Sequence, residues 1–372
     1  MKTWRYIEEN HVSAAYGLAV DEYLLQPTVD DFPATLRLYT YKNYSALAGR
    51  FQNIEAEIDL EQCRREGFDY SRRLTGGGAI IMGEDQLGIC IAVKPNTLDW
   101  KSIPELYSLF SAPIIDALKV LGIEAAFQSK NDIEVNGKKI AGTGVHIAPN
   151  GAIQFHTSLL VDLDILTMLK VLKIPIQKYE DKLKIRAVHQ RMTTVKDLVD
   201  KEVTLEEVKS LIKIQVERHF GIVLEKEVFL SNEMKEIEKL QREKYASDTW
   251  IFQYSPREDM TGMSLVKTPL GLLRTYIALN QETIKSVLIT GDFVDHISIF
   301  TEIERRLKWQ PLDEEHISSV VNDVVHHQSG SRNELPTELI IKAILLSGQR
   351  AGAAHNHSYN GSCYYPTKKI LS

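Results

Sequence analysis

The sequence predicts an α+β protein, with a mixed or antiparallel sheet in a large first domain and a small α+β domain after it. The chain has 372 residues, which is enough for two or three domains. Helical and strand-like apolar spacing alternate through the first 245 residues, and a second alternation begins after a charged helical stretch. We therefore expect a first domain at 1–245, a second at 246–330, and a helix with an irregular tail at 331–372.

Composition describes an ordinary globular protein with 44% apolar residues, 25% charged residues and a net charge of −6. The net negative charge gives no indication of a basic surface for nucleic acid. The sequence contains no run of about 18 apolar residues, so no membrane span is predicted. The N-terminus lacks the apolar stretch of a signal peptide, so we expect a cytoplasmic protein. Neither nucleic acid nor a membrane is an expected partner. Cys63, Cys90 and Cys363 have no disulfide or zinc spacing and are expected to be reduced thiols.

Helical spacing in the first domain is clearest at 12–25 and at 102–122. The second of these begins with a capping box at Ser102 and ends at Gly122, a typical helix stop. Another capping box at Thr204 predicts a helix within 193–221. Strand patterns are predicted at 34–42, 44–51, 68–82 and 87–95.

Two Asn-Gly pairs, at 136–137 and 150–151, are the strongest hairpin signals in the chain. They predict three antiparallel strands at about 132–135, 139–147 and 152–161. Regular pairing would put Lys139 on a partly apolar face, whereas a bulge near the glycines would change that register.

The second domain is predicted to contain two strands within 268–293, joined by a turn at 279–281. A helix follows at 297–307, and another is expected in the last stretch of the chain.

An arginine pair precedes three glycines in a strand context at 72–79. The residues are Arg72, Arg73, Leu74, Thr75, Gly76, Gly77, Gly78 and Ala79. Turn amides and guanidinium groups together favour an anion, and glycines allow a ligand to approach closely. The string is neither a P-loop nor a dinucleotide fingerprint. A tight glycine turn without a ligand is the alternative.

A carboxylate and an ammonium lie on neighbouring strands of the first predicted hairpin. Asp132, with the adjacent amide of Asn131, could hold Mg²⁺ bound to phosphate. Lys139 could stabilise charge that grows on a phosphoryl or carboxyl oxygen, so the group suits an ATP-dependent activation. A solvated hairpin lysine is the alternative. His156 shares a strand face with Gln154 and Ser158, where a structural histidine is the commoner case.

Taken in order, these segments resemble lipoate-protein ligase A and its relatives. The matching strings are GLAVDEYLL (17–25), ALAGRFQN (46–53), RRLTGGGAI (72–80), KNDIEVNGKKIAGTG (130–144), FHTSLLVDLD (155–164), IRAVHQRMTTV (185–195), TWIFQYSP (249–256) and IKSVLITGDF (284–293). The resemblance implies a catalytic domain of the biotin/lipoate ligase type at 1–245 and an accessory domain at 246–330.

The resemblance implies that ATP activates lipoate to lipoyl-AMP, and that a carrier lysine then takes the lipoyl group. The implied carriers are lipoyl domains of 2-oxoacid dehydrogenase E2 subunits or the glycine cleavage H protein. By similarity Lys139 is catalytic and also binds nucleotide together with Asn131 and Asp132, and Asp132 is the Mg²⁺ ligand. The implied substrate-binding residues are Arg72, Arg73, Thr75, Gly76, Gly77, Gly78, Ala79, Gly142 and His156.

The chain departs from these relatives in two places, the segment after the glycine motif and the tail after about 330, for which no counterpart is recognised. Many relatives continue the glycine motif with a His-Asp pair, whereas residues 81–87 lack it, so the preference for lipoate, octanoate or a related medium-chain acid stays open. An octanoyltransferase or lipoyl amidotransferase would need a thiolate near the lysine, and residues 91–362 contain no cysteine. A biotin ligase lacks support because its basic glycine-rich motif is absent. A non-catalytic carrier-binding protein that kept the fold is the alternative from another class.

Overall fold

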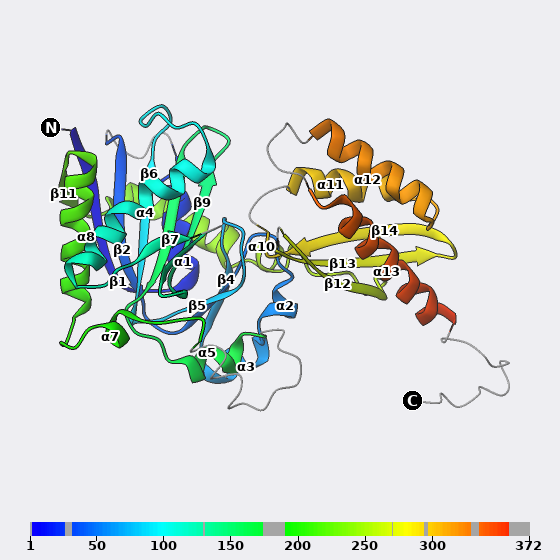
Figure 1. The fold of residues 1–372 in the computed structure, drawn as a ribbon, viewed down its shortest axis with the longest axis horizontal. Helices are drawn as coiled ribbons and strands as arrows, with labels where there is room; N and C mark the ends of the chain where they lie inside the picture. Colours follow the sequence, from blue (N-terminus) through cyan, green and yellow to red (C-terminus); the bar gives the residue numbers. More distant parts are fainter. Residues whose placement is uncertain are drawn as a thin grey trace. The chain divides into compact units, whose positions relative to one another are not determined.

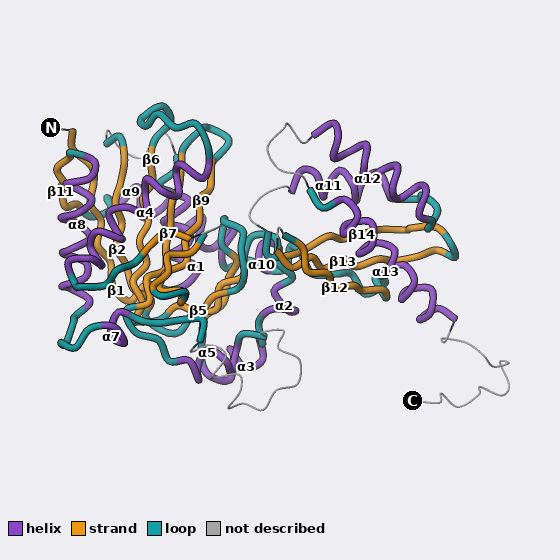
Figure 2. The backbone as a smooth tube through the Cα atoms, viewed as in Figure 1, coloured by secondary structure: helices purple, strands orange, loops and turns teal. Residues whose placement is uncertain are grey.

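The computed structural model describes residues 2–26, 32–128, 131–173, 190–269, 271–293, 297–328 and 335–356. Contacts divide the chain into two compact units, each built from helices and strands (Figures 1 and 2). The first comprises Met1–Arg50, Ile54–Thr75 and Ala79–Gln253, and the second Phe51–Asn53, Gly76–Gly78 and Tyr254–Ser372. The predicted α+β class is confirmed. The predicted tail after 356 and residues 185–189 of the ligase-like string lie outside the described residues.

An eight-stranded mixed sheet forms the centre of the first unit, in the order β11-β1-β2-β6-β10-β9-β8-β7. The strands are β1 (Lys2–Val12), β2 (Ala34–Tyr41), β6 (Gln86–Val93), β7 (Ala126–Gln128), β8 (Asp132–Val135), β9 (Lys138–Ile147), β10 (Ile153–Leu160) and β11 (Ile222–Glu227). β1 pairs in parallel with β2 and β11, and the other pairs are antiparallel. The predicted three-stranded meander is confirmed as β8, β9 and β10.

Helices cover both faces of this sheet. α4 (Ile103–Val120) and α8 (Leu205–Phe220) pack on each other and share one apolar core with β2, β6 and β10. α1 (Ala14–Tyr23) and α9 (Ser231–Leu240) contribute to the core on the other face. The N-caps of the two predicted capping boxes are confirmed, because the Ser102 and Thr204 hydroxyls accept the N–H groups of Glu105 and Glu207, but the Glu105 carboxylate accepts the Lys101 N–H rather than that of Ser102. None of the described helices is both long and apolar enough to cross a membrane.

A second, three-stranded sheet in the first unit carries the arginine pair. Its strands are β3 (Ser45–Ala48), β4 (Asp69–Arg72) and β5 (Ile80–Met82), in the order β4-β3-β5, and the short helices α2 (Ile54–Glu57), α3 (Leu60–Glu66) and α5 (Ile165–Val171) share its apolar cluster. The short helix α7 (Val195–Leu198) contributes instead to the core that α4 and α8 share. The prediction of one continuous strand at 68–82 is wrong, since the chain leaves the sheet after Arg72 and returns at Ile80. Gly77, in this interruption, has a φ of 90°, which side chains other than glycine rarely adopt.

The charged stretch that ends the first unit is not one regular helix. After α9 the chain forms a π-helical turn, η1 (Gln241–Tyr245), and then α10 (Asp248–Ile251). π-Helical turns are rare and often lie at functional sites.

The second unit has an antiparallel sheet of β12 (Gly262–Thr268), β13 (Gly271–Asn280) and β14 (Thr283–Gly291). Its helices are α11 (Ile297–Leu307), α12 (Glu314–Gln328) and α13 (Thr337–Asn356). The hairpin β13–β14 and the helix at 297–307 are confirmed, whereas β12 and α12 were not predicted. α11 packs on β14 and α13 on β12 and β13, and all three helices contribute to the core of this unit.

Candidate active site

A bulge in β9 brings Lys139 to the same face of the sheet as Asp132. Ile133 pairs with Ala141 but Glu134 pairs with Lys139, so Ile140 is an extra residue in the strand. The Lys139 Nζ lies 2.7 Å from Asp132 Oδ1. Both side chains are about 30% exposed, so a ligand can reach the pair. The bulged register, rather than regular pairing, is therefore the one present.

Lys139 is held along its backbone as well. Its N–H donates to the Arg191 carbonyl at 2.8 Å, and its carbonyl accepts the Thr193 N–H at 2.9 Å. Gly142, which pairs with Asp132, lies beneath the lysine side chain: a Cβ there would lie 2.8 Å from Nζ. Lys138, the neighbouring lysine, is exposed.

Asn131 joins the start of β8 to β9. Its amide Nδ2 donates to the Thr143 carbonyl at 3.2 Å, and its own carbonyl accepts both the N–H and the hydroxyl of Thr143. Among the described residues, no three His, Cys, Asp or Glu side chains are grouped as a metal site. In the Lys139–Asp132 pair only Asp132 offers a carboxylate to a metal ion. These residues would therefore fit Mg²⁺ only if phosphate oxygens completed the coordination of the ion.

His156, Thr75 and Arg73 form a connected polar group. His156 Nε2 lies 2.7 Å from Thr75 Oγ1, and Arg73 Nε donates to the same hydroxyl at 3.2 Å. Burial, Arg73 and His146 lower the pKa of His156 to about 3, so its ring is neutral near pH 7. A Cβ at Gly144 would lie 2.3 Å from Nε2, so glycine is required beneath this ring as it is beneath Lys139. Three predicted site residues thus meet here.

Arg72 has a different environment from Arg73. Its side chain is fully buried, and its guanidinium donates to the carbonyls of Gly49, Arg50, Trp250 and Ile251 at 2.7–3.2 Å. These contacts bind the strand β4 to the last helical turn of the first unit. We therefore leave Arg72 out of the proposed substrate contacts.

The three glycines group with the second unit by their contacts. The Gly77 N–H donates to the Phe293 carbonyl at 3.2 Å, so this amide already has a protein acceptor. Ala79 packs against the apolar cluster that contains Ile81 and Met168. The described contacts of Gly77 and Ala79 are therefore with protein groups other than Lys139 and His156.

Residues not predicted from the sequence lie beside His156. His146 is on β9, two residues beyond Gly144, and its pKa is lowered by burial and by Arg50 and Lys244, while Glu22 opposes that shift. Gly142, Gly144 and His146 are alternate residues of one strand, so their side-chain positions share a face, and this spacing could have indicated His146. No sequence signal joins Glu22, Arg50 and Lys244, which are far apart in the chain.

Both described cysteines are buried, and Cys90 on β6 is the direct cross-strand partner of His156 on β10. Burial raises the pKa of the Cys63 thiol to about 11. Burial and the nearby Asp21 raise the pKa of Cys90 well above its usual value. Both are therefore protonated thiols near pH 7, which are poor nucleophiles.

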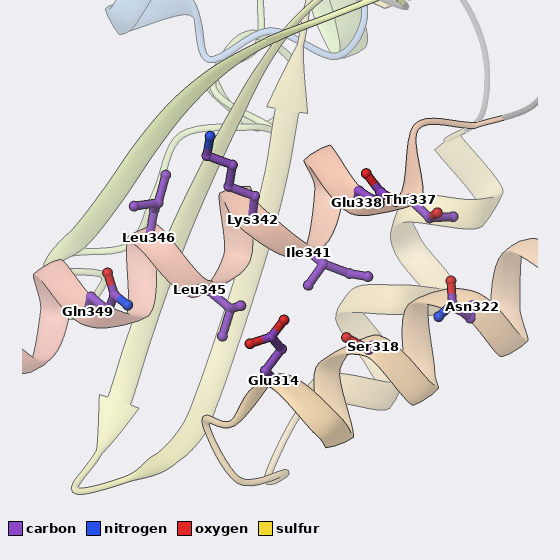
Figure 3. Close-up of a pocket in the computed structure, with 10 residues that line it drawn as sticks. All are labelled: Glu314, Ser318, Asn322, Thr337, Glu338, Ile341, Lys342, Leu345, Leu346 and Gln349. Atoms are coloured by element: carbon purple, nitrogen blue, oxygen red, sulfur yellow. The ribbon is translucent and has the colours of Figure 1, made fainter.

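A separate pocket of about 690 Å³ lies in the second unit, between α12 and α13 (Figure 3). Ile341 and Leu345 of α13 point toward Glu314 and Ser318 of α12. None of the predicted site residues lines it.

The family model of the lipoyl protein ligase A/B catalytic domain matches residues 13–217. This chain belongs to that family. It is an enzyme of the lipoate ligase and octanoyltransferase group, with the fold that the resemblance implied.

Particular relatives differ in their named activity. An octanoyltransferase of Geobacillus kaustophilus is 29% identical over 276 residues, covering 68% of this chain and 99% of the relative. A lipoate-protein ligase of Bacillus subtilis is 27% identical over 310 residues, covering 83% of this chain and 90% of the relative. The solved structure of P. falciparum LipL1 in complex with lipoate has a TM-score of 0.71, 20% identity, and coverage of 92% of this chain and 99% of that one. At that identity the structure shows a shared fold alone.

Proposed function

We propose that this chain is an ATP-dependent lipoate-protein ligase. In the first step a lipoate carboxylate oxygen attacks the α-phosphorus of ATP, and pyrophosphate leaves. In the second step a carrier lysine amine attacks the acyl carbonyl of lipoyl-AMP, so an amide forms while AMP leaves with the bonding electron pair and the amine loses a proton. The carriers would be lipoyl domains of E2 subunits or the glycine cleavage H protein.

The observation that carries this proposal is the accessible Lys139–Asp132 pair. A carboxylate becomes a good acyl donor only when its oxygen is converted into a leaving group, and negative charge grows on the phosphoryl and carboxyl oxygens during that conversion. An ammonium held 2.7 Å from a carboxylate is fixed in place to stabilise such charge. Asp132 and Asn131 would bind the nucleotide, and Mg²⁺ would arrive with its phosphates.

The acid would lie along the polar group that follows Lys139 on the sheet. Arg73, Thr75 and His156 are the residues we propose to contact it, with Gly142 and Gly144 leaving room on the sheet surface. A neutral His156 can hydrogen-bond the acid without adding a second positive charge. Octanoate or a related medium-chain acid would meet the same groups at its carboxyl end.

The lengths of the matches also support the ligase. The match to the Bacillus subtilis ligase covers 83% of this chain, which is more than the stretch from Met1 to Gln253, so it includes part of the second unit. The octanoyltransferase is covered almost completely by only 68% of this chain.

Lipoate-dependent exchange between ATP and labelled pyrophosphate tests the first step directly. The wild-type protein is expected to catalyse the exchange, Lys139→Ala to lose it, and Lys138→Ala to keep it, because Lys138 is the exposed neighbour on the same strand. All three proteins should have the same melting temperature within a few degrees. Full exchange by Lys139→Ala would refute the role of the lysine.

An octanoyltransferase is the second candidate, favoured by the higher identity to the Geobacillus kaustophilus enzyme. That activity would pass the acyl group through a thioester and would need no ATP. The burial and raised pKa values of Cys63 and Cys90 count against it. Acyl transfer from an octanoylated carrier without ATP would favour this candidate.

A further inference from the structure

Two cationic side chains pack against one indole ring in the first unit. The Arg50 Cζ and the Lys244 Nζ each lie 4.3 Å from the centroid of the Trp250 ring. The ring itself is held, because its Nε1–H donates to the Arg72 carbonyl at 2.8 Å and only 9% of the residue is exposed. Arg50 and Lys244 are both half-buried, so neither is a freely solvated surface cation.

Only one of these two cations is neutralised. Lys244 Nζ lies 2.6 and 2.8 Å from the two carboxylate oxygens of Glu22, and the Tyr245 hydroxyl donates to the same carboxylate. The Arg50 guanidinium forms neither an ion pair nor a hydrogen bond with any residue that the structure describes. The five N–H donors of its planar fork are therefore not taken up by any described residue, and the guanidinium lies on the indole ring.

The local backbone that supplies Lys244 is unusual. Lys244 and Tyr245 come from the π-helical turn η1, whose Tyr245 carbonyl accepts the Ser71 hydroxyl at 2.8 Å. A π-helical turn forfeits regular helix geometry, and such turns often lie at functional sites. Here the turn places its lysine on both Glu22 and Trp250.

This cluster adjoins the candidate active site. The Arg50 N–H donates to the Thr75 carbonyl at 2.8 Å, and the Thr75 hydroxyl contacts His156. Burial lowers the pKa of His146, and Arg50 and Lys244 lie close enough to lower it further. The Glu22 carboxylate acts in the opposite direction and raises the pKa of His146.

We propose that Arg50, with Lys244 and Trp250, forms a subsite for a pyrophosphate group. A guanidinium without an acidic partner is suited to a phosphate anion, and the Lys244 ammonium packs on the same indole ring. The group would be either the β- and γ-phosphates of bound ATP or the pyrophosphate released from it. This inference rests on the proposed ligase function. A purely structural stacking of Arg50 on Trp250 is the alternative that the test must separate.

Calorimetric titration of the full-length protein with inorganic pyrophosphate, without ATP or lipoate, tests the subsite. Arg50→Gln is expected to weaken binding about tenfold, the effect of losing charge-assisted hydrogen bonds. Arg50→Lys keeps the positive charge but not the planar fork of donors. Its affinity for pyrophosphate should lie between those of Arg50→Gln and wild type. Arg64→Gln is the matched control, because Arg64 also stands over an aromatic ring, that of Tyr70, yet belongs to the exposed surface of α3.

The outcomes separate this inference from the ligase proposal. If Arg50→Gln and Arg50→Lys both bind pyrophosphate as tightly as wild type, or if Arg64→Gln weakens binding equally, the subsite is refuted while ATP-pyrophosphate exchange can still stand. If wild type binds no pyrophosphate, the subsite is also refuted. If wild type binds it through Arg50 but shows no lipoate-dependent exchange, the ligase proposal fails and the phosphate subsite remains. Arg50→Gln is further expected to raise the KM for ATP while leaving the KM for lipoate unchanged.

Discussion

The Lys139 ammonium reaches Asp132 across the backbone of Gly142, at 2.7 Å from the carboxylate oxygen. The absence of a side chain at Gly142 is what allows this path. A Cβ there would lie 2.8 Å from Nζ and 2.9 Å from Cε, distances that real Cβ atoms essentially never show.

Gly142→Ala is therefore expected to displace the lysine tip and to reduce adenylate formation at least about tenfold, since a misplaced charge-stabilising group commonly costs that much or more. Because the atoms met are the end of a flexible side chain, the fold should change little. Gly352→Ala, on α13, has no atom within 4 Å of the new Cβ and serves as the control. Single-turnover formation of lipoyl-AMP is the measurement. Unchanged adenylate formation by Gly142→Ala would contradict the placement of Lys139.

The low pKa of His156 makes a prediction about stability in acid. Between about pH 3 and 6.5 the unfolded chain binds a proton at this residue that the folded chain excludes. The free energy of unfolding therefore falls as the pH decreases through this window, by up to about 1.4 kcal/mol per pH unit from this one group.

The variant His156→Gln can still hydrogen-bond Thr75 but cannot titrate, so its free energy of unfolding should depend less steeply on pH. Urea denaturation of both proteins at several pH values between 4.5 and 7.5 measures the difference. If the free energies of unfolding of wild type and variant depended on pH in the same way, His156 would be protonated equally in the folded and unfolded chains, and the prediction would be wrong.

Arg72 is expected to matter for folding rather than for substrate affinity. Arg72→Met leaves buried carbonyls of Gly49, Arg50 and Ile251 without their donor, and unsatisfied groups cost about 1–3 kcal/mol each. We expect a loss of about 3 kcal/mol or more in the free energy of unfolding. Arg65→Met, which removes an exposed ion pair with Glu61 on α3, should cost less than about 1 kcal/mol. Equal melting temperatures for the two variants would contradict this role.

Turn chemistry explains why the meander could be predicted. Asn136 and Gly137 have φ values of 52° and 75°, the left-handed conformations that a tight hairpin requires and that these two residue types favour. β12 was missed because Met263 and Leu265 lie on its exposed side, so its apolar pattern does not mark the core. The sequence could not decide whether β9 contains a bulge at Ile140, because the bulge depends on how β9 pairs with β8.

The candidate site was predictable only where its residues lie in recognisable strings. Lys139, Asp132, Arg73, Thr75 and His156 belong to such strings, and the fold brings Thr75 to His156 across 81 positions. The cluster of Glu22, Arg50, Lys244 and Trp250 joins three distant parts of the chain through tertiary contacts. Arg72 and Arg73 are adjacent in sequence, yet Arg72 ends β4 and Arg73 follows it, and their side chains have different partners.

Intact mass of a lipoyl domain tests the central claim most directly, using a variant in which Cys63, Cys90 and Cys363 are all alanine. With lipoate, ATP and Mg²⁺, we expect this variant to lipoylate the domain at a rate close to wild type once its folded fraction is matched by circular dichroism. Without ATP, no mass increase is expected from either protein, even when an octanoylated carrier is supplied. ATP-independent transfer from that carrier by wild type, lost in the cysteine-free variant, would show instead that the enzyme works through a thioester.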